Sequence, residues 1–190
     1  RILISVKEST FIQVKGYPGL EVMGPFITPF IPKSKIYIEV FAGMGRTVEV
    51  EKHERIILND MSDVSVKALK EKFPTAEVTQ RDYWDVIKDY YKNPDALLFF
   101  DPPWRKNIYK NNKGPVFTVD SPIEYYKNIL QKMEFAECKW ILCVDKDEHE
   151  IGKRVSKSKW VNKVISHPTK LLYGRPFAVR MASNMWSEDG

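Results

Sequence analysis

Long apolar runs, paired cysteines and clustered histidines are all missing from this sequence of 190 residues. No apolar run approaches the ~18 residues of a membrane-spanning helix, and no signal peptide opens the chain, so we predict neither a membrane span nor secretion. The two cysteines, Cys138 and Cys143, flank an apolar strand-like segment without metal-ligand spacing. They indicate reduced core thiols of an intracellular, cytoplasmic protein. The three histidines are scattered, and we predict no metal site.

Two nucleotide-binding signatures are missing as well. The P-loop pattern is absent, which argues against an NTPase. A dinucleotide fingerprint would need a third small residue where Val48 stands, so NAD binding is not favoured. The sequence contains no internal repeat or low-complexity tract, and its length predicts one domain, large enough for a sheet between two helical layers.

The most informative stretch that is present follows the apolar run 96–100 and reads Asp101-Pro102-Pro103-Trp104. Five apolar residues without alternation predict a parallel strand that is buried on both faces. A carboxylate at the carboxyl end of such a strand lies where ligands bind in open α/β sheets. The prolines leave nearby carbonyls free to accept hydrogen bonds, and the Trp ring can stack. The pattern therefore favours a site for a planar base with an exocyclic amine over the alternative, a strand that runs into a Pro-Pro turn with Trp104 in the core.

Other segments predict the rest of an α/β fold. Apolar and β-branched runs predict strands over 36–41, 55–58, 76–80 and 139–144, and a closing antiparallel pair over 161–166 and 177–182. Helical spacing predicts intervening helices, one of which begins at a capping box of Ser121 and Glu124 and buries Tyr126. We expect a mostly parallel sheet with helices on both faces and an antiparallel C-terminal strand. Segment 20–31 is either a short helix or irregular, and the basic linker 105–120 is predicted to be a long functional loop.

Three further strand ends carry candidates for ligand binding. The first strand leads into Gly43 and Gly45, where we expect a short helix to begin and a ligand to approach the backbone closely. The second leads into Asp60, which is a candidate to bind a ribose hydroxyl, while Asp60 or Ser62 could cap the next helix, and both roles can hold together. The third leads into Asp82 beside an aromatic residue, and this pair either clamps a purine or caps the helix that follows.

Basic residues are unevenly distributed in a chain whose net charge is +5. No acidic residue occurs between 151 and 187, where many lysines and arginines fall. A second basic cluster directly follows the Trp104 turn and consists of Arg105, Lys106, Lys110 and Lys113, interleaved with Tyr109. Such surfaces are typical of proteins that bind a polyanion, so we predict that the second cluster binds nucleic acid. For the C-terminal segment, a solvated face explains the charge equally well.

Taken together, these motifs resemble those of class I S-adenosylmethionine-dependent methyltransferases, and more closely the adenine-specific DNA methyltransferases of the Dam type. The resemblance runs from about Gly16 to Asn184. Its most specific element is the family's catalytic Asp-Pro-Pro-Tyr motif, matched here by Asp101, Pro102, Pro103 and Trp104. It implies the class I fold, S-adenosylmethionine as the cofactor, and residues 1–190 as a single catalytic domain that begins with an N-terminal extension and cofactor-motif segment over 1–35.

The resemblance also implies which residues bind the cofactor. In the family, a Phe-x-Gly-x-Gly loop lies against the methionine end, an Asp after the second strand binds the ribose, and an Asp-Phe pair lies beside the adenine. The matching residues in this sequence are Tyr17, Pro18, Gly19, Glu39, Phe41, Ala42, Gly43, Gly45, Asp60, Asp82 and Tyr83.

The sequence departs from the family pattern in two places. The family's N-terminal Pro-Gly-Gly-Lys motif continues here as Leu20-Glu21, so its lysine is absent. Only a short sequence separates Asp82 from Asp101, which leaves no room for the target-recognition domain of relatives. Site specificity is therefore expected from the loop after Trp104, from a specificity partner, or from a second copy in a homodimer.

The resemblance predicts transfer of the cofactor's methyl group to N6 of adenine in DNA, with the base flipped out of the duplex. Trp104 would stack on the base, while the Asp101 carboxylate and the Pro102 carbonyl would accept the two amine hydrogens. Two alternatives stay open. One is an RNA adenine or DNA cytosine-N4 methyltransferase on the same scaffold, and the other is a catalytically silent nucleic-acid-binding subunit. The sequence also leaves open whether a restriction enzyme accompanies the protein, as in restriction–modification systems.

Overall fold

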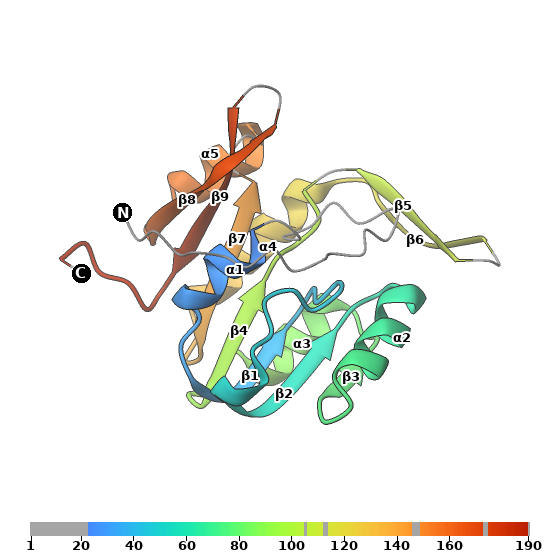
Figure 1. Ribbon diagram of the computed structural model, residues 1–190. Coiled ribbons are helices and arrows are strands. Elements are labelled where there is room, and N and C mark those ends of the chain that lie inside the picture. Colours follow the sequence, from blue (N-terminus) through green and yellow to red (C-terminus); the bar gives the residue numbers. More distant parts are fainter. Residues whose placement is uncertain (1–22, 105, 112–113, 146–148, 173–174, 190) are drawn as a thin grey trace.

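A seven-stranded sheet forms the centre of the molecule, with the strand order β3-β2-β1-β4-β7-β9-β8 (Figure 1). This computed structural model describes residues 23–104, 106–111, 114–145, 149–172 and 175–189. The strands of the sheet are β1 (Ser34–Glu39), β2 (His53–Asn59), β3 (Glu77–Thr79), β4 (Ala96–Phe100), β7 (Lys139–Asp145), β8 (Val161–Leu172) and β9 (Arg175–Ser183).

The pairing of these strands confirms the expected mostly parallel sheet. β1 lies between β2 and β4 and pairs in parallel with both, while β4 also pairs in parallel with β7. β9 is antiparallel to both of its neighbours, β7 and β8. The chain thus moves outward from β1 toward β3 on one side and from β4 toward β8 on the other, so the two halves of the sheet meet between β1 and β4.

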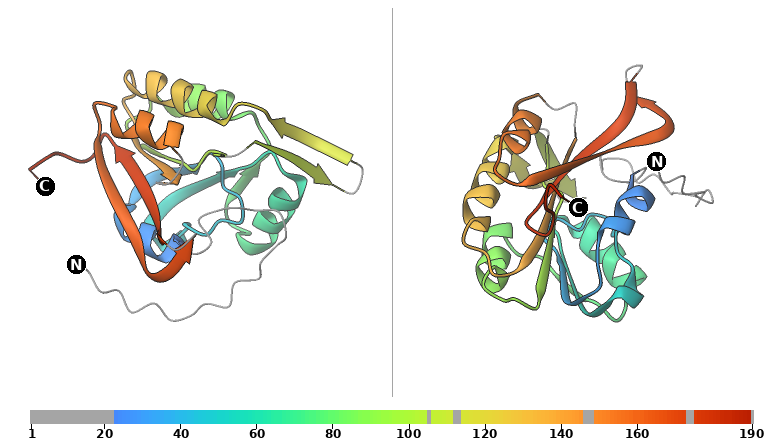
Figure 2. Two further views of the ribbon diagram at one scale, coloured as in Figure 1. Left: turned by 90° about the horizontal axis from the view of Figure 1, so that it is seen from above. Right: turned by 90° about the vertical axis from the view of Figure 1, so that its left-hand side faces the viewer.

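Helices cover both faces of the sheet, as Figure 2 shows. One face carries α1 (Gly24–Ile27) and α2 (Asp63–Lys72), and the other carries α3 (Tyr83–Tyr90), α4 (Pro122–Met133) and α5 (His149–Ser156). The first helix continues into the 3-10 turn η1 (Thr28–Phe30), so the short-helix alternative for segment 20–31 holds in its described part. No described helix is both long and apolar enough to cross a membrane.

The uninterrupted apolar run of β4 packs into two hydrophobic cores, one on each face of the sheet. Leu98 and Phe100 pack with side chains of α3, α4 and α5, while Leu97 and Phe99 pack with side chains of α1 and α2. All five residues of the strand are buried. Because successive side chains of a strand point to opposite faces, a strand covered on both sides needs apolar residues at every position. The prediction of this strand is confirmed in type and in bounds.

The described part of segment 105–120 contains two paired strands, a β-hairpin, rather than the expected long loop. Strands β5 (Asn107–Asn111) and β6 (Gly114–Val119) pair antiparallel, with a register shift between Tyr109 and Lys110. The hairpin projects from the body of the molecule in both figures. Its asparagines, lysines and glycine are typical of loops, so the sequence pattern did not predict these two short strands.

Of two local predictions about helix starts, the helix after the glycine turn is wrong, whereas the start of α4 at Ser121 and Pro122 is confirmed but lacks the expected capping-box hydrogen bond. No helix follows the glycine turn, and only the one-turn 3-10 helix η2 (Val50–Lys52) comes before β2. Several β-branched residues follow the turn, and they lower its helix propensity. At α4, Ser121 is the N-cap residue, but its side chain makes no capping hydrogen bond. Glu124 instead pairs with Lys127 at 3.3 Å, and Pro122 begins the helix with its fixed φ.

Candidate active site

The carboxyl ends of β1 and β4 bring the two main sequence motifs together. These strands are paired in register, with Glu39 opposite Phe99, and the N–H of Val40 donates to the Phe99 carbonyl at 3.0 Å. The glycine turn after β1 and the Asp101 turn after β4 therefore lie at the same edge of the sheet. Because the strand order reverses between β1 and β4, this edge is the switch point at which open α/β sheets bind ligands.

The turn after β4 presents a half-buried carboxylate beside a buried proline. Asp101 is half-buried, Pro102 is buried, and Trp104 is half-buried and packs against the core under α3, α4 and α5. The Tyr126 hydroxyl of α4 donates to the Pro102 carbonyl at 2.9 Å. Sequence reasoning predicted that Tyr126 is buried, which is confirmed, but it did not foresee this contact. Trp104 thus belongs partly to the core and partly to the exposed edge.

The two glycines of the turn after β1 have different surroundings. Both have positive φ, +55° at Gly43 and +71° at Gly45, a region that L residues with a side chain rarely adopt. A Cβ at Gly45 would lie 2.5 Å from Cε2 of Phe73, which follows α2, whereas a Cβ at Gly43 would meet nothing within 4 Å. Gly45 is therefore required by packing. Gly43 leaves open space where a ligand can approach the backbone.

Asp60 ties the end of β2 to this glycine turn. One carboxylate oxygen, Oδ2, accepts from the Gly43 N–H at 2.8 Å, and Oδ1 accepts from the Ser62 N–H at 2.9 Å. The capping role falls to Ser62, whose side chain accepts from the Ser65 N–H at 3.4 Å. Burial raises the pKa of Asp60, while these backbone hydrogen bonds oppose the rise.

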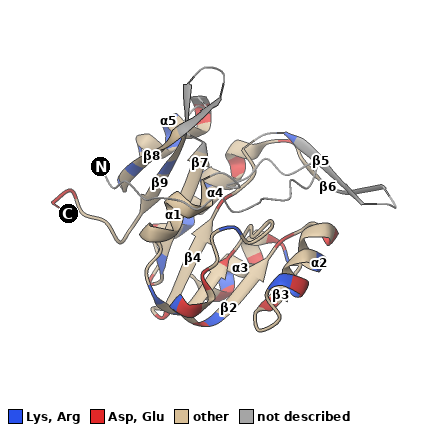
Figure 3. Cartoon of the chain, viewed as in Figure 1, with Lys and Arg blue, Asp and Glu red and all other residues tan. Residues whose placement is uncertain are grey.

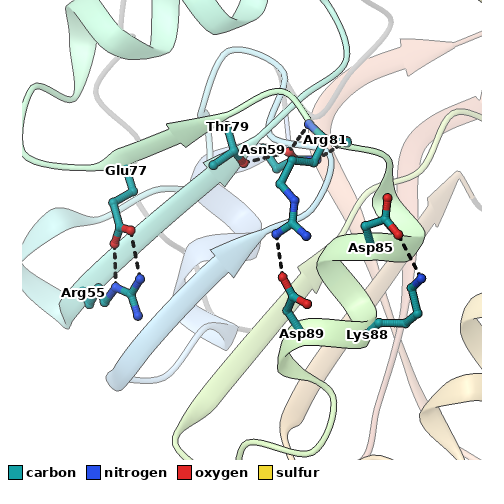
Figure 4. A network of polar contacts seen from close by, with 8 residues as sticks. All are labelled: Arg55, Asn59, Glu77, Thr79, Arg81, Asp85, Lys88 and Asp89. Carbon is teal, nitrogen blue, oxygen red and sulfur yellow. Dashed lines mark hydrogen bonds and ion pairs between the residues drawn. The ribbon is translucent and has the colours of Figure 1, made fainter.

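Asn59, which sequence reasoning missed, connects the ends of β1, β2 and β3, and Figure 4 shows its contacts with Thr79 and Arg81. Its amide nitrogen donates to the carbonyls of Val40 at 3.1 Å and Arg81 at 3.0 Å. Its amide oxygen accepts from the Thr79 hydroxyl at 2.7 Å and the Arg81 N–H at 2.9 Å. The side chain is buried, at 1% exposure, and these four hydrogen bonds use its full donor capacity. Its only sequence signal was an amide directly before Asp60.

Glu39 is a second buried polar group at this edge, at 2% exposure. Both of its carboxylate oxygens accept from the Thr47 hydroxyl, which reaches back from beyond the glycine turn. Burial, together with the neighbouring Asp101 carboxylate, raises the pKa of Glu39 to about 8, against the effect of the Thr47 hydrogen bond. Glu39 thus holds its proton at neutral pH, next to the Asp101 turn.

At the end of β3, Asp82 acts as the N-cap of α3. Its carboxylate accepts from the Trp84 N–H at 2.9 Å and is exposed to solvent. The adjacent Tyr83 packs against Phe41 and Tyr125, with ring centroids 5.6 Å and 4.8 Å away. The helix-capping alternative for Asp82 is therefore confirmed, and Tyr83 joins an aromatic cluster beside the glycine turn. Sequence reasoning did not anticipate the contribution of Tyr125 from α4.

Several residues predicted to bind ligands cannot be placed. Tyr17, Pro18 and Gly19 lie outside the described residues, as do Arg105 and Lys113. Lys106 is exposed at the base of the hairpin, and Tyr109 and Lys110 are positions of β5.

The acid-free segment after residue 150 does not form a single basic patch in the part that the structure describes (Figure 3). Lys153 and Arg154 are exposed on α5, which packs on the same face of the sheet as α4. Lys163 of β8 instead lies over the Trp186 ring at 5.2 Å, and Trp186 packs against the opposite core. The charge of this segment is thus divided between the two faces of the sheet.

No protein-family model matches the chain, and no curated protein matches its sequence. Solved structures do match its fold. A proposed methyltransferase of Streptococcus mutans in complex with SAH is 17% identical, with a TM-score of 0.51, over 88% of this chain and 98% of its own. An rRNA methylase of Streptococcus thermophilus is 9% identical, with a TM-score of 0.51, over 89% of this chain and 98% of its own.

The chain has the class I methyltransferase fold. This fold alone does not identify the reaction. Spermidine synthase of Thermotoga maritima matches the chain as well, with 16% identity and a TM-score of 0.51, over 86% of this chain and 57% of its own. The chemistry must therefore be inferred from the residues at the carboxyl edge.

Proposed function

We propose that this protein transfers a methyl group from S-adenosylmethionine to the exocyclic N6 amine of adenine in DNA. The observation that carries the proposal is the position of the Asp101-Pro102-Pro103-Trp104 turn, which adjoins the glycine turn at the switch point of the sheet. A carboxylate, a carbonyl on a proline pair and a half-buried Trp ring are together suited to a flat base that carries two amine hydrogens.

The residues around the glycine turn fit S-adenosylmethionine. The open space above Gly43 allows a ligand to approach the backbone, and each Asp60 oxygen keeps a further lone pair for a ribose hydroxyl. Glu39 ends β1 directly before the glycine turn and is proposed to contribute a polar group to the site. The aromatic cluster of Phe41, Tyr83 and Tyr125 offers apolar rings for an adenine. Tyr17, Pro18 and Gly19 are proposed to complete the site.

The protein's own contribution to catalysis is to position the amine. When bound, S-adenosylmethionine supplies a methyl group on a positively charged sulfur, which keeps the C–S electron pair as the new N–C bond forms. Asp101 and the Pro102 carbonyl accept the two amine hydrogens and so direct the N6 lone pair. Trp104 stacks on the flipped base. The surplus proton on N6 then passes to Asp101 or to water. Such positioning can supply roughly 7–11 kcal/mol in ideal cases.

The hairpin of β5 and β6 is the proposed contact with the nucleic acid. It leaves the body of the molecule directly after Trp104 and follows the exposed Lys106, in a segment whose sequence is basic. A two-stranded β-ribbon has dimensions that a major groove accepts. Binding that depends on lysine contacts with phosphates should weaken steeply as salt is added.

Replacement of Asp101 by Ala tests the proposal. Labelled S-adenosylmethionine would be incubated with unmethylated DNA, with RNA, or with neither. We expect label in DNA that digests to N6-methyladenosine, and a rate at least ~100-fold lower in Asp101→Ala, because a group that stabilises the transition state is lost. The matched control is Asp95→Ala at the other end of the same strand, where an exposed Asp pairs with Lys35 at 3.6 Å. This control should keep its activity.

The outcomes of this experiment separate the alternatives. Label that appears only in RNA would keep the residue roles and move the substrate to RNA. Tight cofactor binding without transfer to either nucleic acid would point to a silent subunit or a missing specificity partner. Equal rates in Asp101→Ala and Asp95→Ala would contradict the role of Asp101.

A further inference from the structure

The hydrogen bond from Tyr126 to the Pro102 carbonyl connects α4 to the proposed amine acceptor. Tyr126 is completely buried, and its ring packs in the core between the sheet and α3, α4 and α5. Its hydroxyl reaches the carbonyl at 2.9 Å, between residues that are 24 positions apart in sequence. Because the ring is surrounded on all sides, the hydroxyl has little freedom to move away from this carbonyl.

The proline pair makes such an external donor necessary. Neither Pro102 nor Pro103 has a backbone N–H, so neither residue can donate a backbone hydrogen bond that would hold the turn in place. The orientation of the carbonyl between them must therefore be fixed by packing and by donors from other elements. A carbonyl oxygen has two lone pairs, and the Tyr126 hydroxyl takes one of them.

We infer that Tyr126 is a positioning residue of the reaction: its hydroxyl occupies one lone pair of the Pro102 carbonyl and directs the other toward the exocyclic amine of the target base. The inference rests on the proposed function. Tyr126 itself does not touch the base. It sets the direction of one of the two acceptors, while Asp101 supplies the other. Each of the two amine hydrogens then has its own acceptor.

A purely structural role would also explain a buried tyrosine that satisfies a buried carbonyl. The two explanations differ in what Tyr126→Phe does. A structural residue would lower stability and weaken binding to any base alike. A positioning residue would reduce the preference for a base that carries an amine over a base that lacks one, because only the former uses the carbonyl.

The deciding measurement is binding without turnover, in the presence of SAH, which carries no methyl group to transfer. The probes are a short single-stranded oligomer of deoxyadenosine and the same oligomer of deoxynebularine, a purine nucleoside without the amine. We expect the wild type to prefer the adenine oligomer. In Tyr126→Phe, this preference should fall by about threefold to tenfold, as expected for one neutral hydrogen bond, with deoxynebularine binding unchanged.

A matched control and a kinetic measurement complete the test. Tyr91→Phe removes a hydroxyl from a tyrosine at the C-terminal end of α3, near the opposite edge of the sheet, and should keep the full preference. In single-turnover transfer, Tyr126→Phe should be slower by about threefold to tenfold, with an unchanged Kd for S-adenosylmethionine.

The possible results are distinguishable. A wild type that does not prefer adenine over deoxynebularine would overturn both the proposed function and this inference. A wild-type preference that persists undiminished in Tyr126→Phe would overturn the inference alone. Equal loss of binding to both oligomers, together with a lower Tm than that of Tyr91→Phe, would assign Tyr126 a structural role and would also overturn it.

Discussion

The two sides of the candidate site are held in place by different means. On the side of β1 and β2, the glycine turn is fixed by polar contacts, in which Asp60 holds Gly43 and Asn59 joins three strand ends. On the side of β4, the turn is fixed by buried Pro102, by the packing of Trp104 and by the hydroxyl of Tyr126. The first side is therefore held by two side chains at the end of β2 that bind backbone groups of neighbouring segments, whereas the second depends on a helix that comes later in the sequence.

Among variants that test this comparison, we expect Asn59→Ala to cause the largest loss of stability. The substitution leaves buried or partly buried partners unpaired, namely the carbonyls of Val40 and Arg81, the Arg81 N–H and the Thr79 hydroxyl. We expect a loss of about 4 kcal/mol in the free energy of unfolding, measured by urea denaturation. The matched control is Asn93→Ala, which removes an acceptor for the Asp95 N–H at the surface and should cost under ~1 kcal/mol. Equal losses in both variants would contradict a special role for Asn59.

The next effect concerns Glu39, which stands between the two sides. Its pKa in the folded protein, about 8, lies above the 4.5 of an ordinary Glu, so folding binds a proton between these values. The stability associated with Glu39 is complete below about pH 4.5 and is lost as the pH rises to about 8. Relative to Glu39→Gln, which cannot ionise, the wild type should lose about 3 kcal/mol between about pH 4.5 and pH 7. Parallel stability curves for the two proteins would argue against a raised pKa.

The smallest effect compares the two glycines of the turn. Gly45→Ala combines a positive φ with a Cβ only 2.5 Å from Phe73, and should cost about 2 kcal/mol or slightly more. Gly43→Ala has the strained φ but open space, so its cost should be about 1 kcal/mol. The order should reverse for S-adenosylmethionine affinity, measured by calorimetry, because a methyl at Gly43 intrudes into the proposed site. If Gly43→Ala binds the cofactor normally, the turn is not its binding surface.

The sequence predicts best those elements whose pattern lies within a few consecutive residues. β4 was predicted with its bounds because burial on both faces demands an unbroken apolar run, which is visible in five consecutive residues. The antiparallel pair β8 and β9 was also expected, although both strands are longer than predicted. The prediction of a helix after the glycine turn is wrong. It rested on the glycine motif, whereas the β-branched residues that follow the turn disfavour a helix.

The contacts of the candidate site were less predictable because they join distant residues. Tyr126 and Pro102 are 24 positions apart, and Asn59 and Arg81 are 22 apart. Helical spacing correctly placed Tyr126 in the core, but periodicity does not reveal which buried polar atom its hydroxyl meets. Asp60 and Asp82 each allowed two roles by sequence. Asp82 was resolved as a cap by its contact with the Trp84 N–H, while Asp60 was found to hold the glycine turn.

The position of β9 has a consequence for how the protein is made. β9 follows β8 in sequence but lies between β7 and β8 in the sheet, so β8 cannot join the sheet until β9 has emerged and paired with β7. Until residues 175–183 emerge, β7 has an open edge and β8 has no place in the sheet. A truncation just before Arg175 would therefore release two strands rather than one, and would expose the β7 edge to pairing with other nascent chains.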